Sequence, residues 1–382
     1  MSLFSVRPFF KAFFALIVIG VVSGCVGRPA ENASIRAITP SEAVSINDRA
    51  IHDPINLIPK KDDRLTILAL SGGGADGAYG VGVLNGWTKT GTRPEFDIVT
   101  GVSTGALMSV MAFLGPQYDD LLKMLYLWPG DSDIFRDKGV AGFFSDSIYD
   151  NTPLKRLIEK HVTPKLVEEV AREHREGRRL YVATTNLDSS ELVVWDMGLL
   201  ANGGADGRAD KVQLFQKILR ASAAIPVLFP PVYIKPRRGV QLRQAHVDGG
   251  VKAPVLISDF LFERPTKHRD LYIIINGPLT LENAFAAVEP NLRSIAAASV
   301  GSLTSELTHQ AVYRGYVRAQ NTGTSFNLTA IPDDIPILED PLKFDDEHRK
   351  RIYQSGFDEI QKPKFWWKKP PTIKVFDQVA RR

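Results

Sequence analysis

The chain of 382 residues is long enough for one large domain or two ordinary ones, and its composition, 44% hydrophobic and 24% charged, is that of a folded protein. The 47 Lys and Arg residues barely exceed the 43 Asp and Glu residues, and the two signs are interspersed, so the charge gives no support for nucleic-acid binding. A single cysteine excludes an internal disulfide, and stability must therefore come from the core.

The N-terminal segment has the pattern of an export signal. Two basic residues and no acid precede the apolar run Ala12–Val22, which is too short to span a bilayer and ends in small residues. The run leads to Cys25 through "VSGC", which resembles the lipobox of bacterial lipoproteins, with Val22 where Leu is usual. The resemblance implies cleavage of a signal peptide, residues 1–24, and lipidation of Cys25. The alternative is a free thiol after an ordinary cleavage site.

The next segments predict the fold class. Residues 25–62 contain four prolines without a sustained period, which predicts a tether. A buried strand in "RLTILALS", a glycine turn, a helix over 78–88, a strand in "FDIVT", a second glycine turn and another helix then follow. This order predicts an α/β fold with a mainly parallel sheet and helices on both faces. Further strands are expected in "RLYVATTNLDSSELVVW", "RQAHVDGG", "DLYIIING" and "SFNLTAIP", with a long helical region over 281–318.

The first glycine turn matches G-x-G-x-x-G at Gly72, Gly74 and Gly77. A dinucleotide site would need an acid at the end of the second strand, but Asp97 lies at its other end. A phosphate-binding P-loop would need G-K-[ST], which is absent from the turn. Because glycine has no side chain, its backbone N–H can closely approach the oxyanion of an acyl transfer. An oxyanion hole is therefore the favoured interpretation of this turn.

The second glycine turn holds Ser103 in G-x-S-x-G, between a predicted strand and a predicted helix. That context is typical of a nucleophile elbow, which lifts the serine hydroxyl above the sheet at a helix N-terminus. Asp248 ends another predicted strand and is followed by Gly249 and Gly250, which places its carboxylate near the active edge of the sheet.

Four ordered motifs together resemble the patatin-like phospholipases over about residues 65–277. They are G-G-G-x-x-G, G-x-S-x-G, A-S-x-A-x-P-x-x-F-x-P in "ASAAIPVLFPP", and D-G-G. The "ATTNLDSSELVVW" segment also resembles the hairpin of that family. The resemblance implies a three-layer α/β/α fold with a patatin-like catalytic domain over 63–335, and a C-terminal extension over 336–382.

The resemblance also implies a Ser–Asp dyad that hydrolyses ester-linked acyl chains of lipids, without a cofactor or metal. Ser103 would be the nucleophile and Asp248 the base. The remaining site positions implied are glycines: Gly72, Gly73 and Gly74 for the oxyanion hole, and Gly77, Gly101, Gly105, Gly249 and Gly250 as motif positions. The seven histidines and one cysteine show no zinc-ligand spacing.

Asp76 and His246 each allow two interpretations. Asp76 stands where the family usually has Arg or Lys, which weakens the case for an anionic phospholipid; otherwise it is a loop residue favoured by the helix dipole. His246 shares a strand face with Asp248, so it is either a third catalytic residue or a hydrogen-bonded strand histidine. His268, His309 and His348 have no catalytic signature.

The expected protein is an exported, lipid-anchored bacterial acyl hydrolase, attached to the membrane through Cys25. Val26 rather than Asp after the cysteine favours the outer membrane of a Gram-negative cell. Soluble acyl esters are an alternative substrate, and a catalytically silent lipid- or partner-binding envelope protein is an alternative function. The aromatic and basic segment "KPKFWWKKPP" suits either a bilayer interface or packing onto the domain.

Overall fold

The computed structural model of this protein describes residues 63–203, 209–235, 243–263, 265–279, 288–338 and 343–371. The signal peptide, Cys25 and the tether, all predicted within residues 1–62, lie outside the described residues. They therefore stay predictions.

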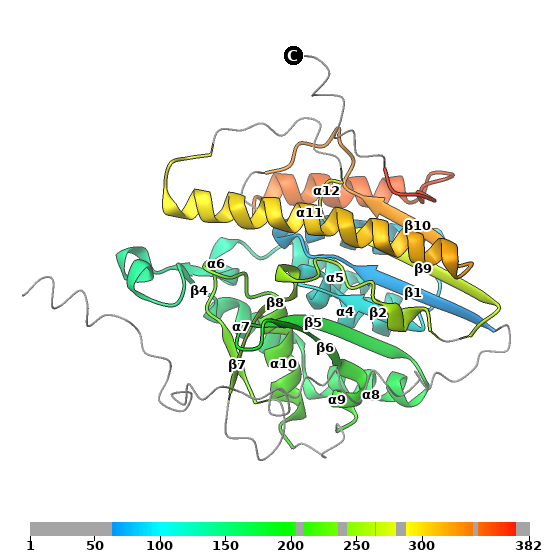
Figure 1. Cartoon of the computed structure of the whole chain (residues 1–382), viewed down its shortest axis with the longest axis horizontal. Helices are drawn as coiled ribbons and strands as arrows, with labels where there is room; N and C mark the ends of the chain where they lie inside the picture. The colour runs from blue at the N-terminus through cyan, green and yellow to red at the C-terminus, as the bar shows by residue number, and fades with distance from the viewer. Residues whose placement is uncertain are drawn as a thin grey trace, which may run out of the picture.

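Eight strands form the central sheet in Figure 1: β1 (Arg64–Leu70), β2 (Ile98–Gly101), β5 (Arg179–Asn186), β6 (Glu191–Asp196), β7 (Val232–Ile234), β8 (Gln244–Asp248), β9 (His268–Ile275) and β10 (Ser325–Ala330). Their order is β10-β9-β1-β2-β5-β8-β7, and β6 pairs with β5 off that path. The strands from β10 to β5 are parallel neighbours, whereas β6, β8 and β7 join antiparallel. The predicted α/β class with a mainly parallel sheet is confirmed.

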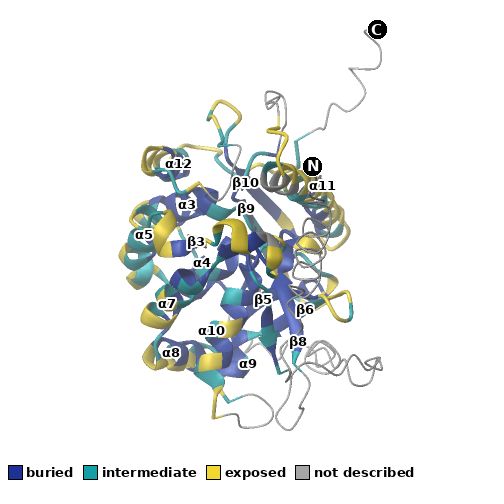
Figure 2. Cartoon of the chain, turned by 90° about the vertical axis from the view of Figure 1, so that its left-hand side faces the viewer, coloured by how far each residue is buried: buried dark blue, intermediate teal, exposed yellow. Residues whose placement is uncertain are grey.

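Helices cover both faces of this sheet. They are α3 (Ala78–Lys89), α4 (Thr104–Leu114), α5 (Asp119–Leu127), α6 (Asp131–Ile134), α7 (Thr152–His161), α8 (Pro164–Arg175), α9 (Met197–Ala201), α10 (Lys211–Ser222), α11 (Leu292–Asn321) and α12 (Asp346–Glu359). The helix α11 crosses the front of the strands in Figure 1, and Figure 2 shows the buried strands between α11 and the larger group of helices. The long helical region was predicted from residue 281, but residues 280–287 lie outside the described part.

Alternation along the strands divides the interior into two cores. In β1, Leu68 and Leu70 face a larger core shared with α3, α4, α5, α7, α8, α10 and α12. Ile67 and Ala69 face a smaller core shared with α11. Because β1 is buried on both faces, it appears in the sequence as a continuous apolar run rather than as an alternating one.

The aromatic segment near the C-terminus packs onto the domain. The ring of Trp366 lies 4.8 Å from that of Trp87 and 5.2 Å from that of Tyr272. The backbones of Trp367 and Leu328 exchange two hydrogen bonds of 2.9 Å, so this segment pairs with the edge strand β10 at one antiparallel bridge. Of the two interpretations of this segment, packing onto the domain is the one that the structure supports for Trp366.

Within the described ranges, no helix is both long and apolar enough to cross a bilayer.

Candidate active site

Ser103 occupies a strained turn between β2 and α4. Its φ of 55° and ψ of −126° are rare for a residue with a side chain, a conformation that costs on the order of 1–3 kcal/mol and persists where the surroundings enforce it. The flanking positions, 101 and 105, have no room for a side chain. A Cβ on Gly101 would lie 2.5 Å from the Gly105 carbonyl oxygen, and one on Gly105 would lie 2.4 Å from the Ser71 carbonyl oxygen. The local geometry is that of a nucleophile elbow.

Ser222, at the end of α10, holds this elbow in place. The Ser103 N–H donates to the Ser222 hydroxyl oxygen at 3.0 Å, and that hydroxyl donates to the Ala183 carbonyl in β5 at 2.7 Å. Ser222 belongs to the A-S-x-A motif, but sequence reasoning gave it no role. Because its N–H is bonded to Ser222, Ser103 has no free amide for an oxyanion.

Strand β5 brings Asp248 to the same turn. At Val182, β5 pairs with Gly101 of β2 on one edge and with β6 on the other. Two residues further along β5, Thr184 pairs with Asp248 of β8, again on the edge of β5 that faces away from β6. The end of β8 therefore follows the end of β2 along one edge of β5, and Asp248 lies beside the elbow. The next residue, Gly249, packs against the Ala183 carbonyl.

The Asp248 carboxyl group is buried, with 5% of the residue exposed. Its Oδ1 accepts the Gly250 N–H at 2.7 Å, while its buried Oδ2 has no hydrogen-bond partner among the described residues. Burial raises the pKa of Asp248 to about 7, against the opposing effects of the Ser103 side chain and the Gly250 N–H. A carboxylate with such a pKa is a far better base near neutral pH than an exposed one.

The first glycine turn, which follows β1 and includes the 3-10 helix η2 (Gly74–Gly77), lies against Ser103. A Cβ on Gly72 would be 3.1 Å from the Ser103 Cβ. The Gly72 N–H, however, donates to the Pro254 carbonyl at 2.9 Å. The expectation that Gly72 serves the oxyanion is therefore corrected, because its only backbone donor is already used. The N–H groups of Gly73 and Gly74 have no partner among the described residues and stay candidates.

Asn276, just after β9, fixes the shape of this loop. Its side chain donates to the Ser71 carbonyl at 2.9 Å and accepts the Gly80 N–H at 3.0 Å, and its own N–H donates to the Ser71 hydroxyl at 2.8 Å. The approach is so close that a Cβ on Gly73, whose φ is 155°, would lie 2.0 Å from the Asn276 carbonyl oxygen. Asn276 was missed in the sequence, where "IIING" signals only a strand and a turn.

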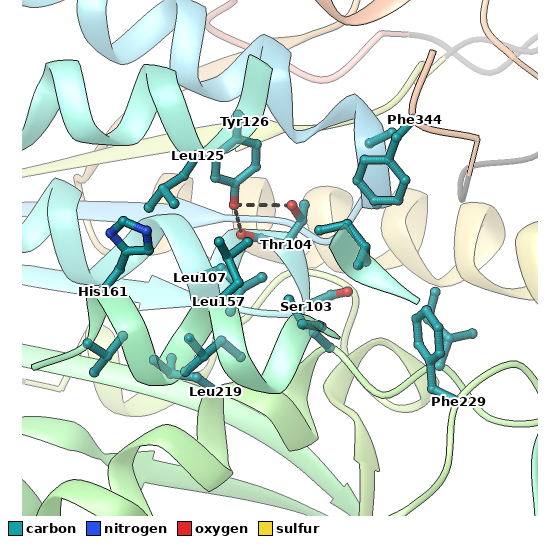
Figure 3. Close-up of a pocket in the computed structure, with 18 of the residues that line it drawn as sticks. Ser103, Thr104, Leu107, Leu125, Tyr126, Leu157, His161, Leu219, Phe229 and Phe344 are labelled. Carbon is teal, nitrogen blue, oxygen red and sulfur yellow. Dashed lines mark hydrogen bonds between the residues drawn. The ribbon is translucent and has the colours of Figure 1, made fainter. Parts of the chain in front are cut away.

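An apolar cavity opens beside Ser103 and the start of the glycine turn. Gly74, Ala75 and Ser103 line it, and its walls come from α4, α5, α7 and α10. Figure 3 shows Phe229 and Phe344 on one side of Ser103, and the leucines with His161 on the other. The labelled apolar side chains are Leu107, Leu125, Leu157, Leu219, Phe229 and Phe344. Such a lining suits the hydrocarbon chain of an acyl group.

Two polar residues shape the same cavity. The Tyr126 hydroxyl donates to the Thr104 carbonyl at 2.5 Å and accepts the Thr104 hydroxyl at 3.1 Å, as the dashed lines of Figure 3 show. These bonds secure the first turn of α4 directly after the nucleophile, and Gly77 packs against both side chains. On the side of the cavity formed by the leucines, burial and the neighbouring Lys160 lower the pKa of His161, which favours the neutral imidazole.

Among the described residues, no hydrogen bond joins His246 to Ser103 or Asp248. Its Nδ1 lies 2.9 Å from the Thr184 hydroxyl, which also accepts the Trp195 Nε1–H at 2.8 Å. Burial lowers the pKa of His246 to about 4. Its buried Nε2 has no partner in the described part of the chain. Of the two interpretations, this environment is that of a hydrogen-bonded strand histidine.

Asp76, the acidic residue of η2 in the first glycine turn, has a partner that the sequence did not reveal. Its Oδ1 accepts a hydrogen bond from His348 Nε2 at 2.8 Å, and both side chains are buried. Asp76 is thus enclosed by α12 rather than exposed to substrate. Among the described residues, no cluster of three or more His, Cys, Asp or Glu side chains is arranged to hold a metal ion.

A family model described as patatin-like phospholipase matches residues 68–261, which is more than half of the chain. The chain belongs to the patatin-like phospholipase family. The matched range contains the glycine loop, Ser103, Ser222 and Asp248, whereas Asn276 and His348 lie beyond it. The curated protein sequences contain no significant match to this patatin-like chain.

Two solved structures have weak overall likeness to this patatin-like protein. VipD from Legionella pneumophila has 13% identity and a TM-score of 0.40, over 78% of this chain and 66% of that one. ExoU of the type III secretion system of Pseudomonas aeruginosa, solved in complex with SpcU, has 15% identity and a TM-score of 0.30, over 79% of this chain and 54% of that one. The chain therefore spans 66% of VipD and about half of ExoU, and the family assignment depends on the family model.

Proposed function

We propose that this protein is a serine acyl hydrolase that cleaves carboxyl esters of lipids through Ser103 and Asp248. The observation that carries the proposal is the placement of Ser103: a strained serine beside a buried carboxyl of raised pKa, at the mouth of an apolar cavity. Family membership gives lipid acyl hydrolysis as the general class of activity.

The acylation step follows from these positions. Asp248 takes the proton of the Ser103 hydroxyl while Oγ attacks the ester carbonyl carbon, whose oxygen becomes an oxyanion. The N–H groups of Gly73 and Gly74, which have no partner in the described part of the chain, would stabilise that charge, and the α4 dipole would add to their effect. Protonated Asp248 then gives its proton to the departing alkoxide oxygen as the C–O bond breaks, which leaves an acyl-serine.

Deacylation uses the same groups in reverse. Asp248 takes a proton from a water molecule, whose oxygen attacks the acyl-serine carbonyl carbon. Asp248 then returns the proton to Ser103 Oγ as the ester bond breaks, and the fatty acid is released. Because one carboxyl serves as base and acid in turn, a pKa of about 7 suits both roles near neutral pH.

The substrate class follows from the cavity lining. The apolar walls favour an acyl chain of a membrane or lyso-lipid, and soluble acyl esters are the second candidate substrate. We also propose that the protein is exported and anchored in the outer membrane through lipidated Cys25, on the evidence of the lipobox-like "VSGC".

A lipid panel tests the proposed activity. Wild type and Ser103→Ala are incubated with diacyl phospholipids, lysophospholipids, triacylglycerol and short-chain soluble esters, and the released fatty acids are identified by mass spectrometry. A fluorophosphonate probe is applied to both proteins in parallel. We expect acid release and labelling by the wild type alone. If the wild type stays unlabelled and releases no acid, the protein is the catalytically silent binding protein instead. Equal labelling of Ser103→Ala would exclude Ser103 as the nucleophile.

A further inference from the structure

The two ends of the glycine turn are anchored by different parts of the chain. On one side, Asn276 binds Ser71. On the other, the Asp76 N–H donates to the Gly73 carbonyl at 3.0 Å, and the Asp76 side chain accepts from His348 Nε2 at 2.8 Å. Gly73 and Gly74 lie between these anchors, and glycines have the least intrinsic preference for a backbone direction. The anchors must therefore set the direction of their N–H groups.

The His348 anchor is itself rigidly placed, because α12 packs backbone to backbone against α3. A Cβ on Gly82 of α3 would lie 2.0 Å from the Tyr353 carbonyl oxygen, and one on Gly356 of α12 would lie 2.5 Å from the Tyr79 carbonyl oxygen. Helix interfaces built on such glycines allow little sliding, since the backbones are already in contact. The imidazole of His348 is thus held at a fixed distance from η2, the turn directly before α3, which contains Asp76.

The first turn of α12 is also tied to the wall of the cavity. Arg349 Nη1 donates to the Tyr126 carbonyl at 3.1 Å and to the Pro129 carbonyl at 2.5 Å. Four residues before His348, Phe344 lines the cavity, and its N–H donates to Asp131 at 2.8 Å. These contacts connect residues outside the matched family range to both the cavity and the glycine turn.

We propose that His348 is a positioning residue for the oxyanion hole, acting through Asp76 to fix the amide directions of Gly73 and Gly74. The inference rests on the proposed function. With the imidazole removed, the Asp76 carboxyl group, on a side chain that is 8% exposed, would lose its hydrogen-bond donor. A buried carboxylate without a partner is strongly unfavourable, so the carboxyl group must take up a proton or move, and in either case the contact that holds the turn is lost. Burial already raises the pKa of Asp76, and the hydrogen bond and charge of His348 oppose that shift.

The test separates positioning from a merely structural role by measuring kcat per functional site. His348→Leu removes the donor, whereas His348→Gln keeps an amide donor near the position of Nε2. Glu347→Gln, on the same helical turn and with its side chain 84% exposed, is the matched control. End-point fluorophosphonate labelling counts the functional sites, so that a reduced folded fraction does not lower the calculated kcat.

For His348→Leu we expect kcat per labelled site to fall about 10-fold or more, with KM within about two-fold of the wild type, because the acyl cavity is unchanged. His348→Gln should recover most of the rate, and Glu347→Gln should match the wild type. If His348→Leu shows no cooperative thermal unfolding, Asp76→Ala decides the matter, since it removes the same anchor without leaving a buried charge.

The inference is overturned if the folded variants that lack the anchor keep kcat per labelled site within about two-fold of the wild type. A fall in the number of labelled sites at constant kcat would equally overturn it, because the role would then be structural alone. These outcomes differ from a failure of the proposed function, which would appear in the wild type as the absence of Ser103-dependent hydrolysis.

Discussion

The backbone N–H of Ser103 donates to the side chain of Ser222, at 3.0 Å, across the gap between β2 and α10. The same hydroxyl donates to the Ala183 carbonyl in β5, so one side chain joins the nucleophile turn, the helix and the sheet. Because the Ser103 backbone is strained, it depends on such contacts to keep its conformation. The Ser222 contact therefore connects the stability of the turn with the position of the nucleophile.

Ser222→Ala should lower kcat per functional site by about 10-fold, because the unpaired Ser103 N–H and Ala183 carbonyl let the turn relax. We also expect a loss of about 1–3 kcal/mol in the free energy of unfolding. Ser109→Ala is the control: that serine is also fully buried, but its hydroxyl donates to the Ala106 carbonyl within α4. Equal kcat values for the two variants would contradict a specific role for Ser222.

The raised pKa of Asp248 predicts the pH dependence of the reaction. Only the ionised carboxylate can accept the Ser103 proton, so kcat/KM should rise with pH and level off above a midpoint near 7. Initial rates on a soluble ester, measured from pH 5 to 9 at constant ionic strength, give this midpoint. A midpoint near 4 would show that Asp248 is not the desolvated base.

The raised pKa of Asp248 also makes the free energy of unfolding depend on pH, in the direction opposite to that of the activity. The folded-state pKa of about 7 lies above the unfolded value, so the folded protein binds more protons between about pH 4 and pH 7. The free energy of unfolding must therefore fall as pH rises through this window, by a few kcal/mol. Asp248→Asn lacks this loss. Although it should reduce turnover at least about 1000-fold, it should be more stable than the wild type at pH 8, and the difference should shrink towards pH 4, in urea unfolding curves.

Features encoded by local spacing could be predicted from the sequence. The parallel strands follow from apolar runs such as Leu65–Leu70. The strained turn at Ser103 follows from glycines two residues away on each side. The decisive supports are non-local: Ser222, Asn276 and His348 contact the site across sequence separations of 119, 205 and 272 residues. No short pattern encodes such contacts, and the use of the Gly72 amide by Pro254 was hidden for the same reason.

His246 provides a test between a dyad and a triad. Its imidazole is bonded to Thr184, and burial keeps it neutral by lowering its pKa to about 4. His246→Asn, which keeps a polar group near Nδ1, should therefore retain kcat/KM within about three-fold of the wild type once corrected for functional sites. A loss comparable with that of Asp248→Asn would establish a catalytic triad.

Lipidation of Cys25 is tested in cells of a Gram-negative host. Wild type should take up a labelled fatty acid and fractionate with the outer membrane, because the lipidated cysteine is the attachment that the lipobox-like motif predicts. Cys25→Ser should carry no label. Equal membrane association of the two proteins, without label in either, would rule out a lipid anchor at this residue.

The cavity predicts that chain-length preference is set by the walls of α4 and α7. Leu157 of α7 lines the same cavity as Ser103 and is drawn between Ser103 and His161 in Figure 3. We therefore expect a larger side chain there to reduce the room for a long acyl chain while leaving the nucleophile accessible. For Leu157→Trp, the ratio of kcat/KM for hexadecanoyl over butanoyl esters should fall about 10-fold or more, mainly by loss of the long-chain activity. Leu303→Trp, at a residue that is 66% exposed on α11, is the control and should leave the ratio unchanged. A ratio that stays constant in Leu157→Trp would mean that the acyl chain does not run along the α7 wall of this cavity.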